Sequence, residues 1–303
     1  MARSKLGPRD IAPIATRALS DFIDDNALGL AAGVAFYAAL SLAPLLLLTL
    51  SITARLGPGL QTHLVGELTR LFGPQVGEAV QGLIAGAETS PGAGLLSTLV
   101  GVGTVLVSAT GAFAELQSAM NRIWDVEPKP HQGLRLVLRV RLLSLGLVVS
   151  LGFLLVVSMA ASAALSTVLG LLGDGSSRSF WVLGELGLSL VVFASMFALM
   201  FKVLPDATVQ WRDVVAGALV TAALFVVGKV LIGLYIGHSA LASSYGAAGS
   251  LVAILVWAYY SAVIVFLGAE ITQVWAARRG AAIVPSARAR RVAHHPGGGK
   301  LGS

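Results

Sequence analysis

Among the ionisable side chains inside long apolar stretches of this sequence, four are the first guide to a site. They are Glu115, Glu185, Lys229 and Glu270. A charged side chain in hydrocarbon costs at least about 2.5–3.5 kcal/mol, so each of the four needs a partner or a purpose. An ammonium group in such a place suits an anionic ligand, whereas a carboxylate suits an ion pair.

Two of these charges fall near the outer level of their stretches. At a rise of about 1.5 Å per residue, Lys229 lies about 12 Å and Glu185 about 6 Å below the outer ends, so the two can meet if their stretches adjoin. One hypothesis is that Lys229, with Glu185, Tyr37 and Tyr235, lines an outward-facing polar cavity for an anionic headgroup. The alternative is a buried ion pair or a snorkelling lysine that only fixes packing, and the sequence favours neither.

The other two carboxylates, Glu115 and Glu270, both lie about 30 Å from the outer ends of their stretches, near the inner face. Interfacial salt bridges are the favoured interpretation, and Asn121 is expected to cap a helix or to bond across helices. Arginines at this level are the natural partners. They are Arg122, Arg139 and Arg141. The sequence thus predicts a structural polar layer made of Glu115, Glu270, Arg139, Arg141 and Asn121.

The elements that must carry these charges are membrane-spanning helices. The chain has 303 residues, of which 56% are hydrophobic and only 12% are charged, whereas soluble proteins carry about 25% charged residues. About 20 apolar residues cross a bilayer as a helix, and six stretches reach that length. They cover residues 28–54, 94–123, 134–172, 181–204, 214–237 and 249–275. The predicted fold is all-α, a polytopic bundle of six transmembrane helices over residues 28–277.

Basic residues predict how this bundle is oriented. Most of the 21 Lys and Arg residues lie before the first stretch, in alternate loops and after the last stretch. Because basic loops stay in the cytoplasm, both termini are expected to face it. The chain is therefore predicted to be a multi-pass membrane protein, with membrane lipids as its partners.

The segments outside the spans carry further expectations. Residues 1–27 are interpreted as a cytoplasmic segment, and residues 60–87 as two short amphipathic helices on the outer side. The basic tail, residues 278–303, is expected to be disordered. Pro44 predicts a helix kink, and residues 239–249 favour a plain turn over a re-entrant segment. Tryptophans at span ends predict an aromatic belt. They are Trp124, Trp181, Trp211 and Trp275.

Enzymatic and nucleic-acid functions find little support in the sequence. There is no cysteine, which excludes thiol catalysis and zinc–thiolate sites. The five histidines form no metal-binding spacing, and no Gly-rich phosphate loop is present. Basic residues lie in loops without interleaved aromatic residues, which argues against RNA binding. We therefore expect no catalytic residues, no metal, no cofactor and no nucleic-acid partner.

Four ordered motifs carry a resemblance to a known family. They are FYAALSLAP at 36–44, LQSAMNRIW at 116–124, LPD at 204–206 followed by WRD at 211–213, and YGAAG at 245–249 followed by GAE at 268–270. Together they resemble the YihY/BrkB family of bacterial inner-membrane proteins, formerly called the ribonuclease BN family. The resemblance spans about residues 28–277. It implies an envelope protein with lipid or lipid-linked transport as the suspected role.

Two functional hypotheses follow from the residues and the resemblance together. The first is a protein that translocates or accommodates a lipid or a lipid-linked anion. The second is a non-transporting scaffold for envelope integrity that binds another membrane component. Ribonuclease activity is not supported, because no set of His and carboxylate ligands converges on one site. A homo-oligomer is compatible with either hypothesis.

Overall fold

The structure is a computed structural model that describes residues 11–40, 111–129, 178–238, 249–281 and 283–292, with scattered positions between 59 and 81 and at 146. Within this part of the chain, three helices are long and apolar enough to cross a membrane: Gly184–Val203, Trp211–Leu231 and Ile254–Arg278. A shorter apolar helix covers Ala27–Leu40. The chain is thus a mostly helical membrane protein, as its composition predicts.

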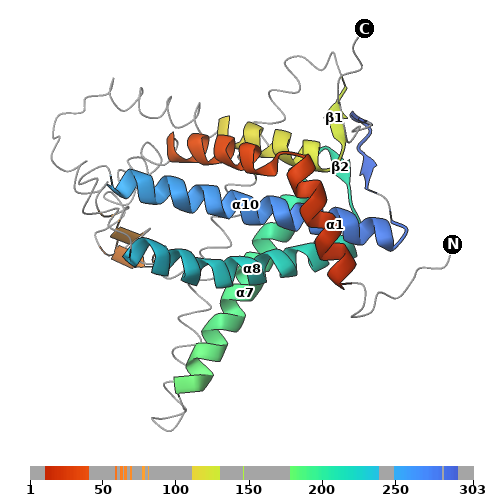
Figure 1. Cartoon of the computed structure of the whole chain (residues 1–303). Helices are drawn as coiled ribbons and strands as arrows, with labels where there is room; N and C mark the ends of the chain where they lie inside the picture. Colours follow the sequence, from red (N-terminus) through yellow and green to blue (C-terminus); the bar gives the residue numbers. More distant parts are fainter. Residues whose placement is uncertain are drawn as a thin grey trace.

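Three of the predicted spans correspond to α7 (Arg178–Val203), α8 (Trp211–His238) and α10 (Gly249–Arg278). Helix α8 packs against both α7 and α10, and Figure 1 shows α8 and α10 running side by side while α7 crosses α8 at a steep angle. Aromatic side chains fill the space between the crossing helices. The ring centroid of Phe225, on α8, lies 4.7 Å from that of Phe193 and 5.2 Å from that of Trp257. These aromatic side chains form the centre of the core.

Helices α8 and α10 approach closely because each presents a glycine to a threonine of the other. A Cβ atom on Gly217 would overlap with Oγ1 of Thr272, and one on Gly268 would overlap with Oγ1 of Thr221. Each threonine hydroxyl donates to the carbonyl of the glycine on its own helix, at 2.7 Å in both cases. The threonines are fully buried without an unsatisfied hydroxyl, and small residues permit the close packing that membrane helices favour.

An N-terminal helix that the sequence analysis does not foresee covers the inner face of α10. Helix α1 (Ile11–Asp24) packs on α10 through Ile14 and Ala18, which are buried together with Val274. The spacing of four residues puts both on one face of the helix. The chain then turns sharply at Asp25 and Asn26 into the helix Ala27–Leu40 (Figure 1). Asn26 adopts a positive φ of 54°, which asparagine tolerates better than most residues.

Two short antiparallel ladders close one end of the bundle, which we call the ladder end. Strand β1 (Val126–Pro128) pairs with β4 (Ala289–Arg291), and β2 (Ala207–Thr208) pairs with β3 (Val284–Pro285). Figure 1 shows them on the right, where α10 ends and α8 begins. The prediction of a purely α-helical fold is therefore wrong in this detail, because the chain between and after the helices finds backbone partners here.

The ladders also correct the prediction of a disordered tail from residue 278 onward. Residues 283–292 are held by β3, β4 and further bonds, such as the Val292 amide donating to the Asp125 carbonyl at 3.0 Å. Two arginines of this basic segment have partners nearby. Arg290 forms an ion pair with Glu127 at 2.9 Å, and Arg291 donates to the Ile283 carbonyl at 2.6 Å. Residues 293–303 lie outside the described part.

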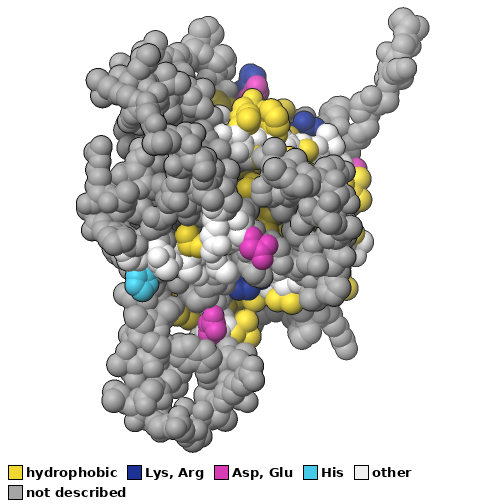
Figure 2. All heavy atoms as spheres, turned by 90° about the vertical axis from the view of Figure 1, so that its left-hand side faces the viewer, with side chains coloured by type: hydrophobic (Ala, Val, Ile, Leu, Met, Phe, Trp, Pro, Cys, Tyr) yellow, Lys and Arg dark blue, Asp and Glu magenta, His cyan; other side chains and the backbone are white. Residues whose placement is uncertain are grey.

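Several predicted elements fall largely on residues that the structure does not describe. They are the span 134–172, the amphipathic segment 60–87, the turn 239–249 and Pro44. Figure 2 shows the end of the molecule opposite to the ladders, where hydrophobic, acidic and basic side chains of the described residues are visible. The candidate site described next lies at the ladder end.

Candidate functional site

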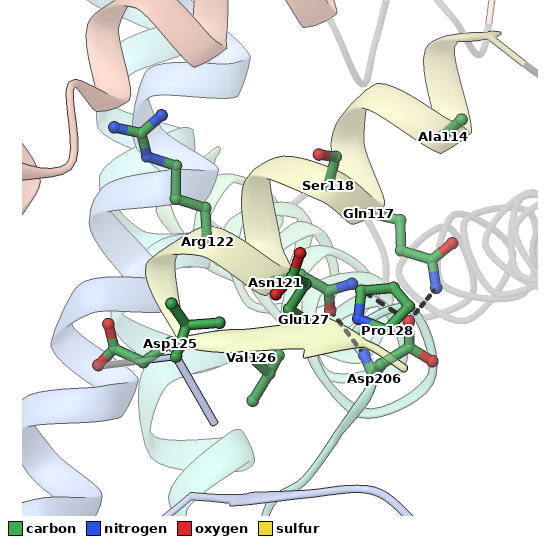
Figure 3. Close-up of a pocket in the computed structure, with 11 residues that line it drawn as sticks. Ala114, Gln117, Ser118, Asn121, Arg122, Asp125, Val126, Glu127, Pro128 and Asp206 are labelled. Carbon is green, nitrogen blue, oxygen red and sulfur yellow. Dashed lines mark hydrogen bonds between the residues drawn. The ribbon is translucent and has the colours of Figure 1, made fainter. Parts of the chain in front are cut away.

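A buried aspartate organises the ladder end. Asp206 follows α7 in the segment Leu-Pro-Asp and is only 2% exposed. Its Oδ2 accepts hydrogen bonds from Gln117 Nε2 and Asn121 Nδ2, both at 3.1 Å. Its backbone amide donates to Asn121 Oδ1 at 2.8 Å, and its carbonyl accepts from the Ser286 amide at 2.9 Å. Asp206 therefore ties the helix 111–123, the α7–α8 connection and the C-terminal strands together (Figure 3).

A polar pocket of about 400 Å³ opens beside this aspartate. Its walls are the last turns of the helix 111–123, strand β1, Asp206 and the end of the C-terminal strands. The lining residues with polar or charged side chains are Gln117, Ser118, Asn121, Arg122, Asp125, Glu127 and Asp206. Three carboxyl groups against one guanidinium give the lining an acidic balance. Arg122 is exposed and points away from Asp206 in Figure 3, so the pocket does not suit an anionic ligand.

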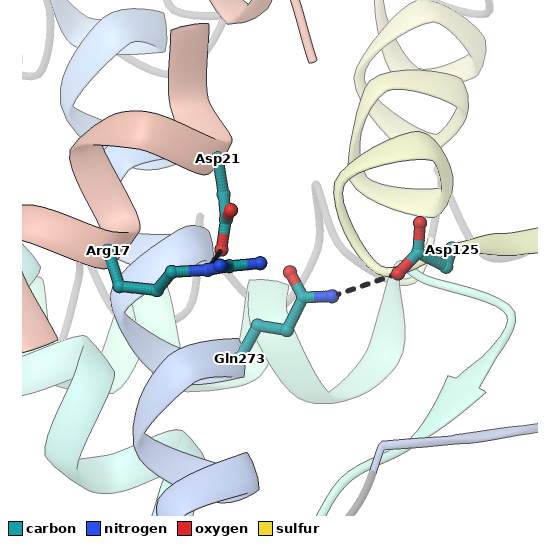
Figure 4. Close-up of polar contacts among 4 residues, drawn as sticks. All are labelled: Arg17, Asp21, Asp125 and Gln273. Atoms are coloured by element: carbon teal, nitrogen blue, oxygen red, sulfur yellow. Dashed lines mark hydrogen bonds and ion pairs between the residues drawn. The ribbon is translucent and has the colours of Figure 1, made fainter. Parts of the chain in front are cut away.

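A second polar cluster lies between α1, α10 and the turn after the helix 111–123. Arg17 pairs with Asp21 on α1 at 2.9 Å, and Gln273 of α10 donates to Asp125 Oδ2 at 3.3 Å, as Figure 4 shows. Asp125 adopts a positive φ of 52° at the turn where the helix gives way to β1. Both acidic groups at the edge of this cluster therefore have a partner.

Glu270 lies at the centre of the same cluster and differs from its neighbours. Its side chain is 0% exposed, and neither carboxyl oxygen receives a hydrogen bond from the part of the protein that the structure describes. Among the described residues, the carboxyls of Asp25, Asp21 and Asp125 lie near enough to act on it electrostatically. Trp124 donates to the carbonyl of Ala269 at 3.2 Å and closes the region from the side.

The structure adds acidic neighbours to the predicted inner layer. The carboxyls of Asp25, Asp21 and Asp125 act electrostatically on Glu270, and α1 brings its acidic C-terminal turn against α10. Glu115 packs against Gly33 of the neighbouring helix, where a Cβ would lie 3.0 Å from Oε1. Asn121 bonds across to Asp206, a packing role of the kind its position suggests. Arg139 and Arg141 lie outside the described residues.

The predicted outer set is only partly brought together. Lys229 on α8 and Glu185 on α7 are both partly buried, on two helices that do adjoin. Tyr37 lies against Gly111, where a Cβ would be 3.0 Å from its ring. The structure does not describe the side chain of Tyr235.

The aromatic belt also needs a correction at one position. Trp124 is only 1% exposed and packs edge-on to Phe201 at 6.4 Å, so it is a core residue rather than an interfacial one. Trp211, by contrast, is exposed, and the ammonium of Lys202 lies 5.4 Å from its ring centroid. The position at a span end is shared by both tryptophans, and only the fold of the ladder end distinguishes them.

The residues that sequence reasoning missed are acidic and polar groups in connecting segments. They are Asp21, Asp25, Gln117, Asp125 and Asp206. A signal did exist for some of them: Gln117 and Asp206 lie inside motifs that carry the family resemblance, and Asp21, Asp24 and Asp25 gather just before the first apolar stretch. Nothing in the sequence indicates that this acidic group meets Glu270.

The apolar helices, the buried polar ties between them and the ladder end define a multi-pass helical membrane protein. More specifically, the chain belongs to the BrkB family, because the family described as "Virulence factor BrkB" matches residues 18–293. This confirms the resemblance carried by the four motifs, and it extends the match into α1 and the C-terminal strands.

Curated bacterial relatives support the same assignment. The chain is 30% identical to UPF0761 membrane protein PBPRA3489 of Photobacterium profundum, with 82% of this chain and 77% of that protein covered. It is also 30% identical to PSPA7_4558 of Pseudomonas paraeruginosa and RC1_0578 of Rhodospirillum centenum, of which it spans only 59% and 57%. Those two relatives are considerably longer than this chain. No solved structure matches the chain.

Proposed function

We propose that this protein translocates or accommodates an amphiphilic lipid or lipid-linked anion in the bacterial inner membrane, with both termini in the cytoplasm. The observation that carries the proposal is the position of Lys229. The side chain is partly buried on a membrane-length helix, at the border between a buried face and an apolar face that is exposed. The exposed residues beside it are Val227, Val230 and Leu231.

This arrangement suits an amphiphile because it offers two different contacts on one surface. The ammonium group supplies a positive charge for an anionic headgroup, while the exposed aliphatic side chains offer contacts to acyl chains. Glu185 is partly buried on α7, which packs against α8, and in this proposal it tunes the local charge. The acidic balance of the pocket at the ladder end is unsuited to the same ligand, and this supports a contact nearer the opposite end of α8.

The proposal assigns no chemical reaction, metal or cofactor to the chain. In the described ranges, no three His, Cys, Asp or Glu side chains are grouped so that they could hold a metal ion. The partners are membrane lipids, and the relatives' printed names state only that they are membrane proteins.

Replacing Lys229 by Gln is expected to lower the translocation of an anionic lipid at least tenfold, because the headgroup loses its cation. Purified protein in liposomes with a labelled lipid measures this directly. Lys229→Arg keeps the charge and should retain most of the flux. Lys129→Gln, at an exposed lysine of the ladder end, is the matched control and should transport normally.

Two outcomes would contradict the proposal. No flux above protein-free vesicles across several classes of anionic lipid would favour the scaffold hypothesis. Equal flux in wild type and Lys229→Gln would show that translocation does not use this lysine. Recovery of folded Lys229→Gln protein at the wild-type level, measured by size-exclusion chromatography in detergent, separates loss of function from loss of folding.

A further inference from the structure

Helix α1 is amphipathic, and the rest of the protein covers only part of its apolar surface. One apolar row recurs every four residues and is buried against α10 and the core: Ile14, Ala18 and Phe22. A second apolar row, one residue further along, is exposed. We call it the exposed row, and it consists of Ala15, Leu19 and Ile23. Leu19 is 53% and Ile23 67% exposed. Single exposed apolar residues are common, but an aligned row of them indicates a contact surface.

The side chains of α1 divide the helix into three sides. At about 100° per residue, the buried row covers about 80° of the circumference, and the exposed row with Ala12 covers about the next 80°. The third side, about 140° wide, is polar apart from Pro13. It holds Thr16, Arg17, Ser20, Asp21 and Asp24. One side for protein, one for lipid and one for water is the pattern expected of a helix that lies along a membrane surface beside a spanning helix.

The level of α1 along α10 fits the boundary of a membrane. Ile14 and Ala18 are buried together with Val274, and the membrane-length part of α10 ends at Arg278. At about 1.5 Å per residue, Val274 lies about 6 Å inside that end, and interfacial helices bury their apolar side about 5–10 Å into the headgroup and acyl boundary. Figure 1 shows α1 crossing α10 steeply near the ladder end. Helix α1 therefore runs across the direction in which α10 spans.

The elements beside α1 indicate the same boundary. After the turn at Asn26, an exposed apolar row resumes at the same spacing on the apolar helix Ala27–Leu40. Its members are Leu28, Ala32, Phe36 and Leu40. At the ladder end, Trp211 begins α8 and is 55% exposed, with the ammonium of Lys202 5.4 Å from its ring centroid. Exposed tryptophan and lysine at the end of a span are typical of the membrane–water interface.

We propose that α1 is an interfacial anchor that lies in the plane of the membrane at the ladder end, with its exposed row in contact with the acyl chains of that leaflet. In the proposed orientation this is the cytoplasmic leaflet. The partner is bilayer lipid, because the exposed row lies on a helix at the depth of the membrane boundary and continues onto an apolar helix. The lipid contact also holds α1 on α10, since leaving this level would return the row to water. This inference does not depend on the proposed transport.

Fluorescence quenching in liposomes measures this contact directly, and the natural absence of cysteine lets a single introduced thiol carry the probe. The full chain is reconstituted in vesicles of phosphatidylethanolamine and phosphatidylglycerol with a fluorophore at Leu19→Cys or at Ser20→Cys. Lipids brominated on their acyl chains should quench the Leu19→Cys probe severalfold more than the Ser20→Cys probe. Iodide on both sides of the membrane should quench the two probes in the opposite order, because Ser20 lies on the polar side.

A probe at Leu219→Cys, on the exposed face of the membrane-length helix α8, sets the scale for full contact with acyl chains. Equal quenching of the Leu19→Cys and Ser20→Cys probes by iodide would show that the exposed row faces water, and it would overturn the proposal. A Leu19→Cys probe that neither quencher reaches would show that a second copy or another segment of the chain covers the row. That result also overturns the proposal.

Thiol labelling in the same vesicles tests whether the lipid contact holds α1 in place. Ala18→Cys puts a thiol in the buried contact with α10, and Leu19→Gln with Ile23→Gln should raise its labelling rate severalfold by weakening the lipid contact. Thr16→Gln with Ser20→Gln changes the polar side of the same helix and should leave the rate unchanged. An unchanged rate in the first variant contradicts the anchor. Equal acceleration by both pairs assigns the effect to general destabilisation and contradicts it as well.

Discussion

Gly268→Ala is expected to destabilise the protein by about 2–3 kcal/mol, although alanine is the better helix former. The new Cβ would overlap with Oγ1 of Thr221 and lie 2.9 Å from its Cβ. Relief requires α8 and α10 to move apart or the threonine to rotate, and rotation breaks the hydroxyl bond to the Gly217 carbonyl. Unfolding in detergent, followed by circular dichroism against denaturant, gives the change in free energy.

The same substitution at a glycine without neighbours provides the matched control. A Cβ on Gly187 of α7 would meet nothing within 4 Å, so Gly187→Ala should be neutral or stabilising by up to about 1 kcal/mol. Adding Thr221→Gly to Gly268→Ala removes the overlapping atoms and should recover part of the loss. Equal effects at Gly268 and Gly187 would show that the helices do not pack through this contact.

Asp206→Ala is expected to cost about 3 kcal/mol or more, because a buried hydrogen-bond hub loses its acceptor. The amides of Gln117 and Asn121 would remain buried without the oxygen to which both donate. The loss should appear as a lower midpoint of denaturation and as easier proteolysis of the C-terminal strands, which Asp206 anchors through Ser286. Both are measurable on purified protein in detergent.

A double-mutant cycle distinguishes this hub from a general effect of removing charge. Asn121→Ala alone should also destabilise, and the double variant should lose much less than the sum, since both changes break the same bonds. Glu127→Ala, which removes an exposed carboxylate paired with Arg290, should cost less than about 1 kcal/mol. An Asp206→Ala protein as stable as Glu127→Ala would show that the hub does not hold the ladder end.

Hydropathy alone determined the membrane class, and four short motifs determined the family resemblance. Apolar length is a local property of the chain, so α7, α8 and α10 were predictable to within a few residues from stretches 181–204, 214–237 and 249–275. The motif around Leu116 to Trp124 likewise pointed to the family that the profile match shows. Neither inference required knowing which helices touch.

Only the tertiary structure decided the polar contacts and the ladders. Asn121 and Asp206 lie 85 residues apart in the sequence, and their pairing depends on the path of the chain between them. The charge pattern predicted arginines beside Glu270, and it did not predict that the sharp turn at Asp25 and Asn26 folds α1 back onto α10 and brings carboxyls near this residue. A local pattern shows that a charge is buried, whereas the identity of its neighbour is set by how distant segments pack.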